Sequence, residues 1–208
     1  LTAILGCSMF LPAIADALVG NDDWIVFVTS GLITTLLGAG IWASSFGYDQ
    51  SLNARQAFFM TAIIWVVLAV FGALPFYWAG INLNFTDAFF ESMSGLTTTG
   101  ATVISGLDDL PPGILLWRSL LQWFGGLGII VMAVAVLPML QIGGMQMFRA
   151  EAFDTAEKIL PRAAQIASNM TTIYIALTFV CAICYWAAGM GLFDAIAHSM
   201  TTVATGGF

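Results

Sequence analysis

Two stretches of the chain combine threonine and glycine in a pattern that suits the coordination of a bare cation. The first ends in Thr97-Thr98-Thr99-Gly100 and the second in Ala204-Thr205-Gly206-Gly207. Backbone carbonyl oxygens can replace the water shell of an ion, and glycine adopts the conformations that aim successive carbonyls at one axis. Threonine hydroxyls can add oxygen ligands or brace such a loop. These residues therefore predict ion-selective loops rather than a catalytic centre.

The two stretches resemble each other at a spacing of 107 residues. Residues 87–100 align with residues 194–207 without a gap, and six of the fourteen positions are identical. The identical pairs are Asp87/Asp194, Ala88/Ala195, Ser92/Ser199, Met93/Met200, Thr98/Thr205 and Gly100/Gly207. Apolar segments on either side repeat in step, which indicates an internal duplication, and a duplication decides the architecture.

Each stretch begins with a segment that is too short to cross a bilayer. A helix over residues 87–95 would span about 13 Å of a hydrocarbon core of about 30 Å, and Gly95 is a natural stop for it. Asp87 and Asp194 are favoured as caps of these helices over direct ion ligands. Non-helical backbone at membrane depth must be buried by protein or line a water-filled cavity, so residues 97–101 predict a filter loop.

The composition indicates a polytopic membrane protein built from α-helices. Of 208 residues, 60% are hydrophobic and 8% are charged, and the mean hydropathy is +0.94. Soluble domains carry about 25% charged residues. A net charge of −7 with only five basic residues argues against nucleic-acid binding.

The apolar segments predict five membrane spans that hold the two short helices in place. Residues 1–46 form an N-terminal pair of spans, with a kink at Pro12. Residues 55–140 form a first repeat, which consists of a span that runs to about Tyr77 with a break at Pro75, the short helix, the filter loop and a second span from residue 114. Residues 141–164 form a cytoplasmic loop. Residues 165–208 begin a second repeat with a span over 165–187.

Glycines within two of the spans predict close contacts between helices. One group lies in the second span, and the other lies in the fourth span, directly after Gln122, Trp123 and Phe124. Small residues allow two backbones to approach each other closely in a membrane. The two groups are Gly31, Gly38 and Gly40, and Gly125, Gly126 and Gly128.

The basic residues predict the orientation. Arg55 lies in one loop, and Arg149, Lys158 and Arg162 lie in the loop after the fourth span, so alternating sides put all four on the cytoplasmic face. Arg118 is the exception, near the outer end of the fourth span, and we expect it to pair with a nearby acid. Residues 149–162 form either a short amphipathic segment or a solvated loop.

The single histidine, His198, occupies the repeat position of Glu91 in the second short helix. A buried hydrogen-bonding role or a position in an outer vestibule is favoured over catalysis. No nucleophile–base pair, metal-ligand cluster or phosphate-binding loop is recognisable in the sequence. The sequence therefore does not predict an enzyme.

Three segments carry a resemblance to a known family: FTDAFFESMSGLTTTGATV, LLWRSLLQWFGGLGIIVMAVAVLPML and HSMTTVATGGF. They resemble the TrkH-type subunits of bacterial potassium uptake systems, in the Trk/Ktr/HKT superfamily. The resemblance implies four consecutive potassium-channel-like repeats of span, re-entrant pore helix, filter loop and span around one pore. This chain would supply the N-terminal pair, the first repeat and the start of the second, truncated at its filter.

The resemblance also implies the residues that bind the ion. The filter glycines would be Gly100 and Gly207, with Gly206 as the competing choice for the second. Potassium ligands would be the carbonyls of Thr98, Thr99, Thr205 and Gly206, with Thr97 and Ala204 just below them. The implied function is potassium translocation across the bacterial inner membrane, with K⁺ as the transported ion and coupling to protons or sodium. The implied partners are a TrkA-type cytosolic nucleotide-binding regulatory subunit, a second copy in a homodimer, and lipid.

Two alternatives remain open. A sodium or ammonium transporter could use the same architecture, because the residues alone do not select the ion. A membrane-embedded scaffold or enzyme belongs to a different class, and an enzyme would need a polar catalytic cluster within the spans.

Overall fold

The computed structural model describes residues 1–45, 54–135 and 159–208, and over these ranges it contains helices and no strand. The α-helices are α1 (Thr2–Ser8), α2 (Phe10–Val19), α3 (Trp24–Ser44), α4 (Ala54–Trp78), α5 (Phe85–Leu96), α6 (Pro112–Ala135), α9 (Ile159–Ala187) and α10 (Leu192–Val203), and a 3₁₀ turn covers Leu107–Asp109. Five helical stretches within the described residues are long and apolar enough to cross a membrane: 2–19, 24–44, 58–78, 112–130 and 165–187. The predicted all-α polytopic fold is confirmed.

The first span is divided into α1 and α2 at Met9. Pro12 has no N–H to donate to the carbonyl of Ser8, four residues earlier, so the regular hydrogen-bond ladder is interrupted there. The Ser8 hydroxyl donates to the Leu5 carbonyl at 2.7 Å. The helix is therefore interrupted near the predicted kink, at Met9, three residues before the proline.

The third span ends at Trp78, next to its predicted end near Tyr77, but the predicted break at Pro75 is wrong. Pro75 lies inside α4, and its carbonyl still accepts a hydrogen bond from the N–H of Ala79 at 3.0 Å. The predicted loop over 141–164 is too long, because α9 already begins at Ile159 and includes Arg162. Residues 136–158, with Arg149 and Lys158, lie outside the described residues.

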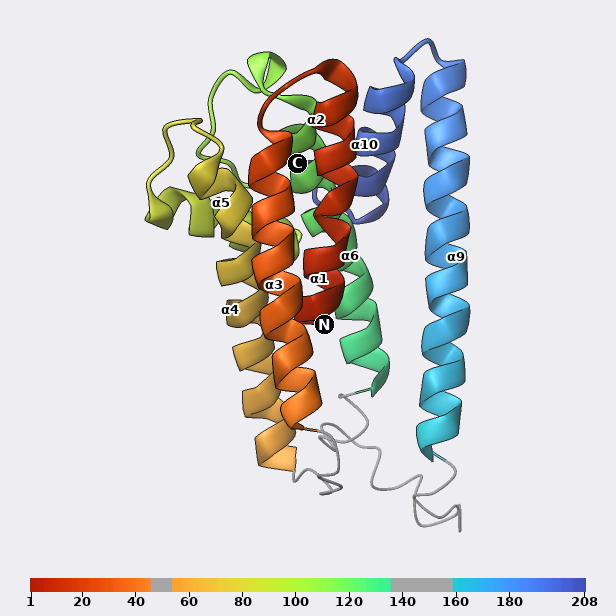
Figure 1. Cartoon of the computed structure of the whole chain (residues 1–208). Helices are drawn as coiled ribbons and strands as arrows, with labels where there is room; N and C mark the ends of the chain where they lie inside the picture. The colour runs from red at the N-terminus through yellow and green to blue at the C-terminus, as the bar shows by residue number, and fades with distance from the viewer. Residues whose placement is uncertain (46–53, 136–158) are drawn as a thin grey trace.

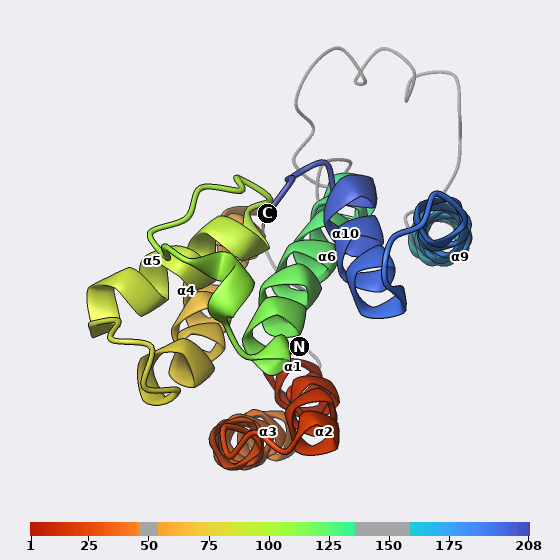
Figure 2. The same ribbon diagram turned by 90° about the horizontal axis from the view of Figure 1, so that it is seen from above.

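Helix α6 is the central element of the molecule (Figure 2), where it lies between α5 on one side and α10 on the other. It is the most buried of the five spans, whereas α9 is the least buried and stands beside the bundle (Figure 1). Two hydrogen bonds join α6 to α9. The Trp123 indole donates to the Thr178 hydroxyl at 3.0 Å, and the Tyr174 hydroxyl donates to the Trp123 carbonyl at 3.1 Å.

A buried carboxylate connects the N-terminal helices to α6. Asp16, which is fully buried at the end of α2, accepts a hydrogen bond from the backbone N–H of Gly113 at 2.6 Å. Gly113 is the second residue of α6, where backbone N–H groups have no partner within the helix. A Cβ atom at this glycine would collide with the Asp16 carboxylate. The carboxylate therefore caps a helix 97 residues away in the sequence.

Glycines bring α1 and α3 into backbone contact. A Cβ atom on Gly38 would collide with the backbone of Ala3, and one on Gly6 would collide with Thr35. A Cβ atom on Gly31 would lie 3.0 Å from the carbonyl oxygen of Gly6, a tight contact. The prediction for Gly31 and Gly38 is confirmed, but Gly40 has open space around it.

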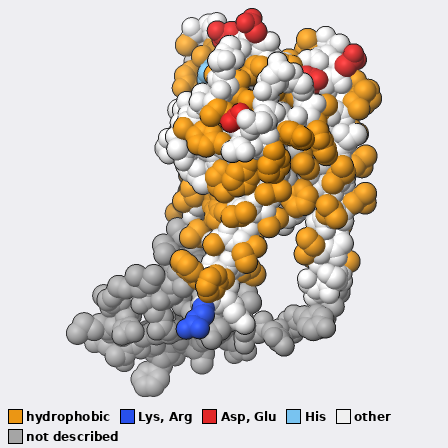
Figure 3. All heavy atoms as spheres, turned by 90° about the vertical axis from the view of Figure 1, so that its left-hand side faces the viewer, with side chains coloured by type: hydrophobic (Ala, Val, Ile, Leu, Met, Phe, Trp, Pro, Cys, Tyr) orange, Lys and Arg blue, Asp and Glu red, His pale blue; other side chains and the backbone are white. Residues whose placement is uncertain are grey.

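Charged side chains gather at the two ends of the molecule, with an apolar band between them (Figure 3). The acidic residues in this view lie at one end and the visible basic side chain lies at the other. This separation agrees with the prediction that the basic residues gather on one face. Which of the two faces the cytoplasm stays a prediction.

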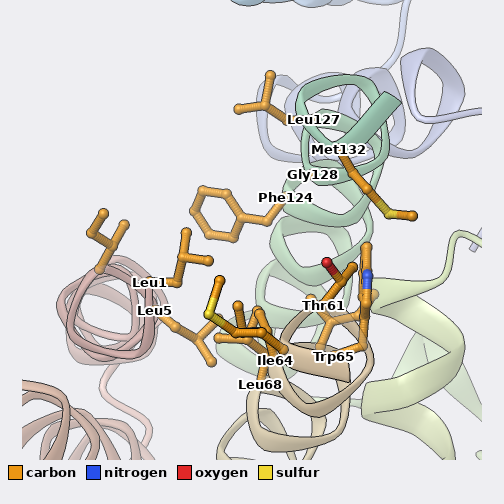
Figure 4. Close-up of a pocket in the computed structure, with 13 residues that line it drawn as sticks. Leu1, Leu5, Thr61, Ile64, Trp65, Leu68, Phe124, Leu127, Gly128 and Met132 are labelled. Atoms are coloured by element: carbon orange, nitrogen blue, oxygen red, sulfur yellow. The ribbon is translucent and has the colours of Figure 1, made fainter. Parts of the chain in front are cut away.

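A cavity of about 430 Å³ lies between α1, α4 and α6 (Figure 4). Leu5, Trp65, Leu68 and Phe124 point into it, and Thr61 is the one polar residue in its wall. Such a wall offers almost no oxygen atoms in place of water, so this cavity does not suit a potassium ion.

Candidate ion-binding site

The two short helices correspond to each other residue by residue. Helix α5 covers Phe85–Leu96 and α10 covers Leu192–Val203, so both have twelve residues and both ends are offset by 107. Each is about 18 Å long and is therefore too short to span. The predicted stop at Gly95 is wrong by one residue, because α5 continues through Gly95 to Leu96.

The loops after the two helices repeat the same unusual backbone conformation. Thr98 and Thr205 have φ angles of 54° and 61°, and Gly100 and Gly207 have φ angles of 73° and 64°. A positive φ at a β-branched residue is a rare and strained state, and such strain concentrates at functional sites. Gly206 does not share this conformation, so the backbone pairs Gly207 with Gly100.

The two predicted filter loops donate hydrogen bonds through backbone N–H groups, but their carbonyl groups accept none among the described residues. The N–H of Thr99 donates to the Ser94 carbonyl at 3.0 Å, and the N–H of Gly206 donates to the Thr201 carbonyl at 3.2 Å. Within the part of the chain that the structure describes, no hydrogen bond is accepted by the carbonyls of residues 97–100 or 204–207. Seven of these eight residues are exposed or half-buried, and Ala204 is buried. The oxygens are thus available to a ligand.

The threonine hydroxyls of the first loop brace it. The Thr97 hydroxyl lies 2.8 Å from the Met93 carbonyl, to which it donates, and 2.7 Å from the Thr99 hydroxyl. The Ser94 hydroxyl donates to the Ala101 carbonyl at 2.6 Å, which fixes the far end of the loop. Of the two predicted roles for these hydroxyls, bracing is the one that the contacts support.

The two loops meet through their backbones. A Cβ atom on Gly100 would collide with the carbonyl oxygen of Gly206. The tip of the first predicted filter is thus in contact with the second, although the two are more than a hundred residues apart in the sequence.

The glycine pair of α6 allows this approach. A Cβ atom on Gly125 would collide with the backbone of Leu96, the last residue of α5. A Cβ atom on Gly126 would lie 3.2 Å from the Cα of Ala204, directly after α10. The prediction that these glycines admit another backbone is confirmed. Each of them contacts one of two hairpins, of which the first is α5 with residues 97–101 and the second is α10 with residues 204–207.

Gln122 is a site residue that sequence reasoning missed. It is fully buried in the middle of α6, its Oε1 accepts the N–H of Phe208 at 3.2 Å, and its Nε2 has no partner among the described residues. A Cβ atom on Gly206 would collide with its amide. The sequence did contain a signal for Gln122, because it is an uncharged polar residue within an apolar span, one helical turn after Arg118.

Arg118 pairs with an acid as predicted. Its Nε lies 2.8 Å from Oε1 of Glu91, and both side chains are almost completely buried. Taking two charges out of water costs several kcal/mol per ion in proteins, by order of magnitude, so such a pair needs good geometry and further hydrogen bonds.

The predicted capping role of the two acids is wrong. The N-terminal residue that caps α5 is Asn84, whose Oδ1 accepts the N–H of Asp87 at 2.9 Å. Helix α10 has Gly191 as its N-cap residue and no side-chain cap. Asp87 and Asp194 lie in the first turn of their helices, where a negative charge interacts favourably with the helix dipole.

His198 is exposed on α10, so the predicted buried role is wrong, and the vestibule position stays a prediction. Among the described residues, no group of three His, Cys, Asp or Glu side chains could hold a metal ion.

Comparison with known proteins agrees with this geometry. The chain is 47% identical to the Trk system potassium uptake protein TrkH of Vibrio parahaemolyticus and 44% identical to that of Escherichia coli strain K12. Each alignment covers 100% of this chain and 44% of the relative, so the chain spans less than half the length of these proteins.

A solved structure and a family model also match this chain. The crystal structure of the potassium transporter TrkH from Vibrio parahaemolyticus superimposes with a TM-score of 0.86 at 45% identity, and the match covers 100% of this chain and 42% of that one. The model of the TrkH family, described as a cation transport protein, matches residues 25–208. With its duplicated short helices and glycine loops, the chain belongs to the TrkH family of cation transport proteins.

Proposed function

We propose that this chain forms two walls of a pathway that moves potassium ions across the inner membrane of a bacterium. The ion would be held by the carbonyls of Thr98, Thr99, Thr205 and Gly206, with Thr97, Gly100, Ala204 and Gly207 completing the two loops. One observation carries the proposal: two loops with the same positive-φ pattern meet at Gly100 and Gly206 while their carbonyls accept no hydrogen bond among the described residues.

The electrostatics favour a cation at this point. The C-terminal ends of α5 and α10 lead directly into the loops, and each helix end carries roughly half a negative charge. Carbonyl oxygens are dipoles without net charge, so an ion can leave them again.

Two walls leave an ion open on its other sides, and roughly four are needed to replace a full water shell. Family resemblance suggests that two further repeats complete the pore. It also suggests a TrkA-type cytosolic nucleotide-binding subunit, a homodimer, and coupling of potassium uptake to protons or sodium. The names of the relatives support potassium as the ion.

The main alternative is a transporter of the same architecture that moves sodium or ammonium. Uptake of labelled potassium in the presence of each competing ion separates these possibilities. A membrane scaffold or enzyme is the second alternative, and the names of the relatives favour transport over it.

The test replaces Gly100 or Gly207 with serine in the protein with its full natural chain. Both variants should insert into the membrane but discriminate less between potassium and sodium in flux assays. Gly40→Ser is the matched control, because a Cβ atom at Gly40 meets nothing within 4 Å. If both filter variants support growth on limiting potassium and keep the selectivity of the parent protein, the proposal is wrong.

A further inference from the structure

We propose that Arg118 is a positioning residue that couples the two filter loops, so that ion selectivity depends on it although it does not contact the ion. The inference rests on the proposed function, because it concerns how the two candidate filters are held relative to each other. Arg118 lies on α6, between the two hairpins, and its contacts extend to both.

On the side of the first hairpin, Arg118 acts through Glu91. Its Nε donates to Glu91 Oε1 at 2.8 Å. The same carboxylate accepts the Thr102 hydroxyl at 2.8 Å and the N–H of Val103 at 3.1 Å. These two residues follow directly after the first filter loop. The ion pair thus fixes the point at which the chain leaves that loop.

On the side of the second hairpin, Arg118 contacts Phe208, the residue after Gly207. The guanidinium carbon lies 4.0 Å from the centre of the phenyl ring, within the range of a cation–π interaction. Phe208 is held a second time by Gln122, whose Oε1 accepts its N–H. Residues four apart in a helix lie on the same face, so one face of α6 holds the chain after both filters.

Net stability does not explain why an arginine occupies this position. Replacing a buried ion pair with apolar residues of similar size is often neutral or stabilising. The Nη2 atom of Arg118 is also buried without a hydrogen-bond partner among the described residues, which adds a cost. What the arginine provides is a planar group that can donate to a carboxylate through one edge and stack on a ring through its face.

The first test is the double variant Glu91→Gln with Arg118→Met in the protein with its full natural chain, reconstituted in liposomes. Glutamine keeps an acceptor for Thr102 and Val103, and no uncompensated charge remains. The variant should unfold near the temperature of the parent protein. The flux ratio of potassium to sodium should fall about twofold to thirtyfold, the range that corresponds to the loss of one cation–π contact.

The second test changes only the ring. Phe208→Leu removes the cation–π contact and keeps the backbone N–H, whereas Phe208→Tyr keeps both. The leucine variant should lose selectivity, and the tyrosine variant should retain it. This pair decides the question if the Arg118 variant fails to assemble.

Folded variants that keep the parent flux ratio in both tests would overturn the inference. Gly100→Ser, measured in the same assay, separates this outcome from a failure of the proposed function. If Gly100→Ser alters the ratio and the Arg118 and Phe208 variants do not, only the coupling role is wrong. If Gly100→Ser has no effect either, the filter proposal itself is wrong.

Discussion

The two hairpins reach nearly the same backbone conformation with different supports. The first is held largely by its own side chains: Asn84 caps α5, Ser94 fixes the end of the loop, and Glu91 binds both the returning chain and Arg118. The second has no side-chain cap, and an exposed histidine takes the place of Glu91. Its loop depends instead on Gln122 of α6.

This difference shows which features of the duplication matter for the site. The lengths of the short helices and the positive φ angles are the same in both copies, whereas the bracing contacts have diverged. In the proposed site, an ion would contact the backbone oxygens and not the bracing side chains. The geometry of the loop is therefore the constrained feature, and the means of holding it can vary.

The largest expected difference between the hairpins concerns Glu91 and His198. Glu91→Ala leaves the buried charge of Arg118 without its partner and should destabilise the protein by about 3–5 kcal/mol. His198→Ala removes an exposed side chain and should cost less than about 0.5 kcal/mol. Thermal unfolding of the detergent-solubilised protein measures both. Equal destabilisation by the two substitutions would mean that Glu91 supports the first hairpin no more than His198 supports the second.

The next difference lies in the glycine pair of α6. Gly125→Ala forces a methyl group into the backbone of Leu96, whereas Gly126→Ala meets the movable Tyr174 hydroxyl and a Cα atom at 3.2 Å. Overpacking costs about 1–3 kcal/mol, and Gly125→Ala should lie at or above the upper end of this range. Unfolding temperatures of the two variants check the order, and a larger loss for Gly126→Ala would contradict it.

A smaller difference is expected between the filter glycines. Gly100→Ala combines a collision with the Gly206 carbonyl and an unfavourable φ, whereas Gly207 has open space and only the unfavourable φ, which costs about 1–2 kcal/mol. Gly207→Asn should be milder than Gly207→Ala, because asparagine tolerates left-handed backbone. Potassium flux should therefore fall most in Gly100→Ala, less in Gly207→Ala and least in Gly207→Asn. Equal flux in the two Gly207 variants would exclude φ strain as the cause of the loss at Gly207.

The smallest effect concerns the helix starts. Asn84→Ala removes the cap of α5 and should destabilise the protein by about 1 kcal/mol. Gly191→Asn would give α10 the cap that it lacks, with a gain of a few tenths of a kcal/mol by order of magnitude. Hydrogen exchange of the first turn of each helix should respond in opposite directions in the two variants.

Much of the local structure could be predicted from the sequence. The five spans follow from runs of apolar residues, and the gap-free repeat predicts two short helices of matching length. Errors occurred where a single residue was given too much weight. Pro75 lies near the end of α4, where the helix can absorb it, and Gly95 is accommodated inside α5.

For the site, the sequence indicated the residues more reliably than their individual roles. The threonines and glycines of both loops were recognisable, and so was the need of Arg118 for an acidic partner. The capping residue was misassigned, because Asn84 and Asp87 are both suitable caps and only the start of the helix distinguishes them.

The sequence by itself determined the helices, the duplication and the loop residues, because hydropathy and repeat spacing are local properties of the chain. Only the tertiary structure decided that Glu91 is the partner of Arg118, that Gln122 holds Phe208 and that Asp16 caps α6. These contacts join residues that are 27, 86 and 97 positions apart. No local pattern encodes them, because they depend on which helix faces pack together around α6.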